Sequence, residues 1–425
     1  MRNPVPYAGP VTRRRAMIRR LPLLAFFAIY LPTCYLGTIL LLLPGTGLSV
    51  RAGLTPRDVL VVLVLLHIPP ALLWMAAEAS FRSLSRRWSR REPSGTFAPE
   101  PPWLAWLVFF AALAVAGWSL HRADALSFLA AWFDHVTYLA ARRHVMARLT
   151  FFEFVNLYTV LPLAGAYVVL VQKRRWWAAV VVAPLIGLAQ YPLAQRRVLL
   201  TSALLMGAAW YVHAFVGPAQ SRAARRRPVQ VFLGGAVVLY AFFVILSLQW
   251  SPLAGSTSGL LKRYAVPAIQ YSVVFPRMLP YYHADIGLDI LGIGRMPDDS
   301  IRVPQVWTPG TDYTVSAPFQ FVLYSQGGVL VALAGSVILG AVLGASWAAV
   351  LAEPHLSATR SLLGALVIIF GAFLAMDSAR NSVTVSYGLA WGVLMVAGLH
   401  VASCLWPSAA ATPGGSDDQR ARRPV

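Results

Sequence analysis

The sequence predicts an all-α fold, a polytopic bundle of about ten transmembrane helices with both termini in the cytoplasm. Hydrophobic residues make up 58% of its 425 residues and charged residues only 12%, about half of the charged fraction usual in soluble domains. The apolar residues form long blocks, several of which reach the roughly 20 residues that a helix needs to cross a bilayer. Short clusters of arginine and lysine separate many of these blocks, as expected of loops on the cytoplasmic side.

The expected spans fall into three groups along the chain. A basic cytoplasmic tail over 1–20 precedes three spans within 21–120, and four more lie within 151–248. The last three lie within 316–405, before a polar tail over 406–425 that is expected to be disordered. The individual spans are expected at 21–43, 59–79, 103–120, 151–171, 176–193, 198–216, 231–248, 319–350, 362–376 and 383–405. The block at 319–350 is long enough to be tilted or to have a re-entrant start, which leaves nine or eleven spans as alternatives.

Two stretches between spans are too polar to cross the membrane. Residues 121–150 carry apolar side chains at helical spacing, which predicts an amphipathic helix on the outer surface. These side chains are Leu126, Leu129, Phe133, Val136 and Leu139. Residues 249–315 form one large loop, which would face the periplasm or the extracellular space.

Several classes of function are disfavoured by composition. The net charge of +20 does not indicate a nucleic-acid partner, because the basic clusters lie between apolar blocks and no nucleic-acid-binding motif is present. Cys34 and Cys404 lie in apolar blocks, which excludes a disulfide framework or a CxxC metal site. No P-loop is present, so direct use of ATP is not expected, and neither a metal nor a cofactor is expected. Charges in the middle of spans are nearly absent, which disfavours an ion-coupled transporter.

Arginines on the predicted outer side are not required by the topology rule. The planar guanidinium binds phosphate oxygens in bidentate fashion, so these residues favour an anionic, lipid-linked substrate. The alternative is that they reach lipid headgroups, which is the interpretation we apply to Arg51, Arg57 and Arg122. Arg196 and Arg197 differ, because they occupy the tip of a tight hairpin at the membrane surface.

The large outer loop supplies a candidate base. Arg277 precedes His283 and Asp285 in this loop. A neutral imidazole can accept the proton of a sugar hydroxyl, as glycosyl transfer requires, and a nearby aspartate can orient it. The alternative is that His283 is a solvated loop residue.

Four features together point to a known family. The outer segment from Tyr138 to Arg143 leads into the span at 151–171, and the hairpin ends in Gln195-Arg196-Arg197 followed by Val-Leu-Leu-Thr-Ser-Ala-Leu-Leu. A large outer loop comes late in the chain, and Ala317-Pro318-Phe319 with Tyr324 to Gly328 opens a glycine-rich helix. This arrangement resembles the O-antigen and repeat-unit polymerases (Wzy-type) and the related O-antigen ligases.

The resemblance implies a GT-C-like, metal-independent glycosyltransferase of the bacterial plasma (inner) membrane. It would transfer an oligosaccharide from undecaprenyl pyrophosphate to a hydroxyl of another lipid-linked unit, alongside a chain-length regulator and a flippase. The catalytic residues would be His283 and Arg277. The substrate-binding residues would be Arg196, Arg197, Arg142, Arg143, Arg263, Arg380 and Asp285.

Three alternatives remain open from the sequence. A ligase would differ only in its acceptor. A polysaccharide or lipid transporter would be expected to show internal repeats, and none is found at a fixed period. A structural membrane protein would not need convergent arginines on its outer side.

Overall fold

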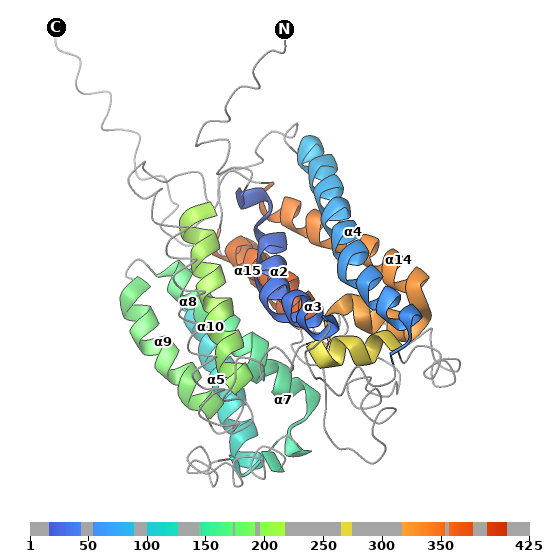
Figure 1. Ribbon diagram of the computed structural model, residues 1–425. Coiled ribbons are helices and arrows are strands. Elements are labelled where there is room, and N and C mark those ends of the chain that lie inside the picture. The colour runs from blue at the N-terminus through green and yellow to red at the C-terminus, as the bar shows by residue number, and fades with distance from the viewer. Residues whose placement is uncertain are drawn as a thin grey trace, which may run out of the picture.

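The described residues are helical and contain no strand, which confirms the all-α expectation for this part of the chain (Figure 1). The structure is a computed structural model that describes 17–43, 54–88, 100–125, 144–145, 147–172, 175–191, 196–216, 265–273, 317–352, 357–376 and 389–405. Within these described ranges, five stretches are long and apolar enough to cross a membrane: Leu21–Leu42, Pro56–Arg87, Pro102–Arg122, Phe152–Val171 and Phe319–Val350. The protein is therefore a multi-pass helical membrane protein.

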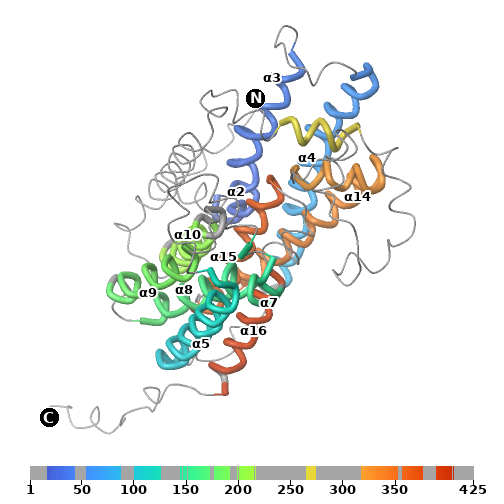
Figure 2. The backbone as a smooth tube through the Cα atoms, turned by 90° about the horizontal axis from the view of Figure 1, so that it is seen from below, coloured from blue at the N-terminus to red at the C-terminus, as the bar shows by residue number. Residues whose placement is uncertain are grey.

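The first helical group is built on the N-terminal span. That span consists of α2 (Leu21–Tyr30), the π-helical turn η1 (Leu31–Tyr35) and α3 (Leu36–Leu42). Pro32 falls within η1, where its missing amide hydrogen accounts for the departure from α-helical register. The long helices α4 (Pro56–Trp88) and α14 (Phe319–Val350) lie along each other in both views (Figures 1 and 2). Buried side chains of all these helices form one apolar cluster.

Glycines allow α4 and α14 to approach closely. A Cβ atom added to Gly344 would lie 2.1 Å from the carbonyl oxygen of Ala77. One added to Gly340 would lie 2.4 Å from the carbonyl oxygen of Leu73. Small residues at such positions let helix backbones pack directly against each other in a bilayer, where dispersion contacts replace the hydrophobic effect as the driving force.

The second helical group surrounds one buried helix. It comprises α5 (Pro102–Arg122), α7 (Phe151–Val155), η4 (Asn156–Val160), α8 (Leu161–Val171), α9 (Arg175–Gln190), α10 (Arg196–Tyr211) and α16 (Leu389–Leu405). The π-helical turn η6 (Val212–Val216) continues α10, and its Val212 packs in the cluster of the first group. Every residue of α8 except Val171 is buried. The side chain of Asn156 is also buried and donates from Nδ2 to the carbonyl oxygen of Ala112, 2.9 Å away, which joins η4 to α5.

Helix α15 (Ala358–Leu374) joins the two groups. Its Ile368 and Ala372 belong to the apolar cluster of the first group, whereas Leu366 and Ile369 belong to that of the second. Successive residues on different faces thus pack in different directions, which explains why this helix is buried nearly all round.

Polar contacts join helix ends that the sequence assigns to the same side of the membrane. Trp347, near the end of α14, donates from Nε1 to the carbonyl oxygen of Ile18 at 2.9 Å. Glu100, before α5, accepts from the backbone N of Thr359 at 3.1 Å and from its Oγ1 at 2.9 Å. Burial raises the pKa of Glu100 above its ordinary value, and the hydrogen bonds from Thr359 partly offset that rise.

The helix boundaries correct several expectations. Helix α4 was expected to end at Ala79, but it continues to Trp88, so Arg82, Arg86 and Arg87 lie on a helix and not in a loop. The pair Glu78 and Arg82, one turn apart, supports this extension. Helix α5 includes 121–122, which we assigned to the amphipathic segment. The expected span at 231–248, the tail at 406–425 and most of 121–150 and 249–315 lie outside the described residues.

Replacing Gly344 by alanine is expected to separate α4 from α14. The added Cβ would meet the backbone oxygen of Ala77, which cannot rotate away, so the free energy of unfolding should fall by about 1–3 kcal/mol. Reversible denaturation in detergent micelles measures this. Gly117→Ala is the control, because nothing lies within 4 Å of the Cβ position there. Equal stability of the two variants would contradict the close packing.

Candidate functional site

The hairpin arginines open a helix. Helix α10 begins at Arg196, so the backbones of Arg196 and Arg197 form its first turn, while their side chains are outside the described part. The positive end of the helix dipole lies there, and basic residues at that end do not stabilise a helix. Helix stability therefore does not explain the arginine pair. An anion bound at this turn would be stabilised by the dipole and by the arginines together.

A buried glutamine fixes this hairpin to the bundle. Gln190, at the end of α9, donates from Nε2 to the carbonyl oxygen of Leu157 at 2.6 Å and to Oγ of Ser202 at 2.6 Å. Ser202 lies in the second turn of α10. One amide group thus joins α9, η4 and α10 directly beneath the arginine pair.

Proline explains why the carbonyl of Leu157 is available. In η4 the hydrogen bonds run from residue i to i+5, as the bond from the amide of Leu161 to the carbonyl oxygen of Asn156 shows. The partner of Leu157 in this register would be the amide of Pro162, and proline has no amide hydrogen. Gln190 supplies the missing donor. Sequence reasoning did not identify Gln190, although a glutamine inside an apolar block was the available signal.

A short buried helix lies within the segment expected to be a large outer loop. It covers 265–273, and Ala265, Ala268, Ile269 and Tyr271 pack in the same cluster as Phe319. Both views place it beside the end of α3 and the start of α14 (Figures 1 and 2). The sequence analysis missed it, because nine residues are too few to be read as a span.

This short helix connects two of the candidate site residues. Arg263 precedes it by two residues and Arg277 follows it by four. Four residues reach at most about 14 Å, so the backbone of Arg277 stays within that distance of the buried helix. Both arginines are thus attached to an anchored element, although they themselves lie outside the described residues.

Helix α14 is broken near its start. Gly328 has φ 74° and ψ −165°, a conformation that glycine adopts without strain, and the break separates the first turns from the rest of the helix. We expected this block to be tilted or to have a re-entrant start, and the break shows that its first turns run differently from the remainder. Tyr324, before the break, lies within electrostatic range of Arg57 and Asp58 at the start of α4.

One of the arginines that the sequence predicts on the outer side has a protein partner. Arg122 forms an ion pair with Glu153, with Nε 3.1 Å from Oε1, and its Nη2 donates to the carbonyl oxygen of Arg148 at 2.9 Å. Glu153 also completes a capping box with Thr150. The expectation that Arg122 reaches lipid headgroups is therefore replaced by a pairing between the ends of α5 and α7.

Seven of the predicted site residues belong to segments that the structure does not describe. Outside the described residues lie Arg142, Arg143, Arg263, Arg277, His283, Asp285 and Arg380. Their assignment to one site remains a prediction. In the part of the chain that is described, no group of three or more His, Cys, Asp or Glu side chains is placed to share a metal ion.

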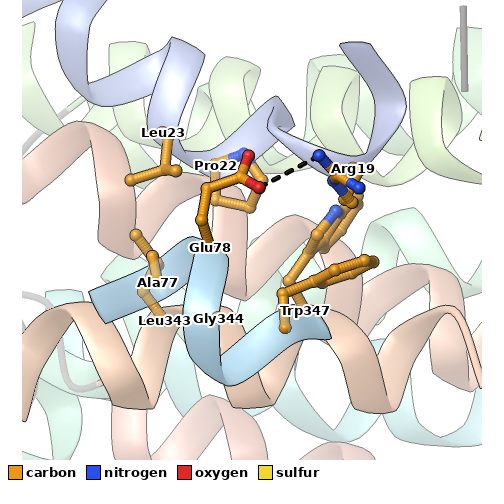
Figure 3. A pocket seen from close by; sticks show the side chains of 9 residues that line it. Arg19, Pro22, Leu23, Ala77, Glu78, Leu343, Gly344 and Trp347 are labelled. Carbon is orange, nitrogen blue, oxygen red and sulfur yellow. Dashed lines mark hydrogen bonds and ion pairs between the residues drawn. The ribbon is translucent and has the colours of Figure 1, made fainter. Parts of the chain in front are cut away.

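The sequence analysis missed a charged cluster at the opposite end of the bundle. The Glu78 carboxylate on α4 accepts hydrogen bonds from Nη2 of Arg19 at 3.0 Å, from Nε of Arg20 at 2.5 Å and from Nε of Arg82 at 3.2 Å. Figure 3 shows the Glu78 carboxylate directed at Arg19 beside a hollow between α2, α4 and α14. The hollow has room for about one water molecule, so it is too small for a sugar.

Comparison with known proteins identifies no relative: no family model, no curated protein and no solved structure matches the chain.

Replacing Gln190 by methionine is expected to loosen the arginine hairpin. The change keeps the size of the side chain but leaves the buried carbonyl of Leu157 unpaired, which should cost about 1–3 kcal/mol of stability. Hydrogen–deuterium exchange of the amides in 191–200 should become faster.

Tyr30→Phe is the matched control for this variant. The Tyr30 hydroxyl donates to the carbonyl oxygen of Leu66 at 2.9 Å in the first helical group. Its loss should lower stability without changing exchange in 191–200. Unchanged amide exchange in 191–200 of the Gln190→Met variant would contradict the claim that Gln190 attaches the hairpin to the bundle.

Proposed function

We propose that this protein is a membrane glycan polymerase that transfers an oligosaccharide from undecaprenyl pyrophosphate to a hydroxyl of another lipid-linked unit. The observation that carries the proposal is the attachment of two arginine-bearing segments to buried structure. Arg196 and Arg197 open α10 above the Gln190 tether, and Arg263 and Arg277 flank the buried helix over 265–273. Guanidiniums suit a pyrophosphate, because they donate in bidentate fashion to phosphate oxygens and stabilise the charge that accumulates on the leaving group.

The proposed reaction is a single displacement. The acceptor hydroxyl oxygen forms a bond to the anomeric carbon, and the bond from that carbon to the pyrophosphate oxygen breaks. His283 takes the proton of the hydroxyl, with Asp285 orienting the imidazole. Undecaprenyl pyrophosphate leaves with the electron pair, and Arg196, Arg197 and Arg277 stabilise its charge. Attack from the face opposite the leaving group inverts the anomeric centre.

The remaining candidate residues bind the second substrate in this proposal. Arg142 and Arg143 would bind its lipid head group or anionic sugars, while Arg263 and Arg380 would add positive charge to the proposed site. No metal takes part, because the arginines neutralise the pyrophosphate.

The proposed topology has about ten spans with both termini in the cytoplasm, in the bacterial inner membrane. Two contacts at opposite ends of the bundle support the alternation of spans. Glu78 pairs the start of α2 with the end of α4, and Glu153 pairs the end of α5 with the start of α7. The active site would then face outward, where a flippase delivers the substrate and a chain-length regulator acts.

A reconstitution assay tests the proposal. Purified protein supplied with an undecaprenyl-pyrophosphate-linked repeat unit should produce a ladder of longer glycans. Arg196→Ala, Arg277→Ala and His283→Ala should each slow elongation by about 10²-fold or more, because each removes a group that acts on the transition state.

Arg57→Ala is the control for these variants, since this exposed outer arginine is assigned to lipid headgroups. A single transfer to a different acceptor would identify a ligase. Lipid movement between leaflets without any elongation would overturn the enzyme and favour a transporter.

A further inference from the structure

The Glu78 cluster carries more positive than negative charge. Three guanidiniums converge on a single carboxylate, from Arg19 and Arg20 at the start of α2 and from Arg82 on α4. The side chain of Glu78 is only 10% exposed, whereas those of Arg19, Arg20 and Arg82 are 30%, 36% and 55% exposed. The carboxylate is thus covered by its partners, and the excess positive charge lies on the surface of the protein.

Hydrogen-bonding capacity remains after Glu78 is satisfied. A guanidinium has five N–H donors, and Arg20 uses only Nε toward the carboxylate. An anion with several oxygens can use these donors, which the single carboxylate cannot saturate.

The guanidiniums are held in place before any ligand arrives. The guanidinium carbon of Arg20 lies 5.2 Å from the ring centre of Trp74, and that of Arg19 lies 5.9 Å from the ring centre of Phe81. The bond from Trp347 to the carbonyl of Ile18 fixes the chain just before both arginines. Little conformational entropy is therefore lost when an anion binds.

The neighbouring surface is apolar. The apolar side chains that line the hollow beside Arg19 are buried, but Met75 on α4 is 60% exposed and Val342, next to Leu343 on α14, is 49% exposed. A soluble anion gains nothing from such a surface, whereas a lipid phosphate brings acyl chains that pack on it. The position at the ends of α2, α4 and α14 matches the depth of a headgroup.

We infer that Arg19, Arg20 and Arg82, held in place by Glu78, bind the phosphate of an anionic phospholipid. The site is separate from the proposed polymerase site, and the inference does not depend on that function. Its predicted position in the cytoplasmic leaflet agrees with the negative surface charge of that leaflet.

Native mass spectrometry of the detergent-solubilised protein tests this inference, with titration of phosphatidylglycerol and phosphatidylcholine. The wild type should prefer phosphatidylglycerol. Arg20→Gln and Arg82→Gln should each reduce that preference about fivefold, the equivalent of about 1 kcal/mol per arginine. Arg87→Gln is the control, because Arg87 is an exposed arginine in the last turn of α4 outside the cluster. It should leave the preference unchanged.

Two further arms make the result decisive. Arg82→Lys keeps the charge and the helix but loses the planar fork, so it should retain part of the preference. Inorganic phosphate at millimolar concentration should not displace the lipid. No preference for phosphatidylglycerol, an equal loss in Arg87→Gln, or displacement by inorganic phosphate would each overturn the assignment.

Discussion

Backbone carbonyls released by proline are the constraint on which this structure depends. Pro70 leaves the carbonyl of Leu66 without its amide partner, and Tyr30 from the neighbouring span donates to it at 2.9 Å. Pro162 likewise has no amide hydrogen for the carbonyl of Leu157, and that carbonyl accepts a hydrogen bond from Nε2 of Gln190. Because the bilayer core has no water to satisfy such groups, each bond fixes where two helices cross. One such bond stabilises each helical group.

The two helical groups contain different charged and buried features. The first holds the charged cluster of Glu78 and the buried helix over 265–273, and the second holds the hairpin that begins α10. Helix α15 packs against both and sets their spacing. A site that draws one arginine segment from each group thus depends on packing along this helix, well away from the arginines themselves.

The sequence predicted the spans well where apolar length alone defines them. The expected bounds at 151–171 and 319–350 match the helices observed there, and 21–43 differs by one residue. The expected end of the second span at Ala79 was wrong. Helix α4 extends to Trp88, and this extension depends on the pair of Glu78 with Arg82 and on packing against α14. The cluster itself could not be predicted, because Arg20 lies 58 residues from Glu78 along the chain. The same reason applies to Arg122, whose partner Glu153 is 31 residues away.

The sequence indicates candidate site residues but not the contacts that support them, and their assignment to one site stays a prediction. The arginine pair that drew attention in the sequence lies at the start of α10. Residue patterns could not indicate that Gln190 holds this hairpin, since that bond depends on the π-helical register before Pro162. The short helix over 265–273 has too little apolar length to be recognised from composition.

Photo-crosslinking with an undecaprenyl pyrophosphate analogue that carries a diazirine near the phosphates tests the central claim most directly. Peptide mapping should place the crosslinks in two segments, 190–200 and 263–277, and an unlabelled lipid-linked oligosaccharide should suppress both. Crosslinks confined to the Glu78 end of the bundle, or crosslinks that the oligosaccharide does not reduce, would contradict the account.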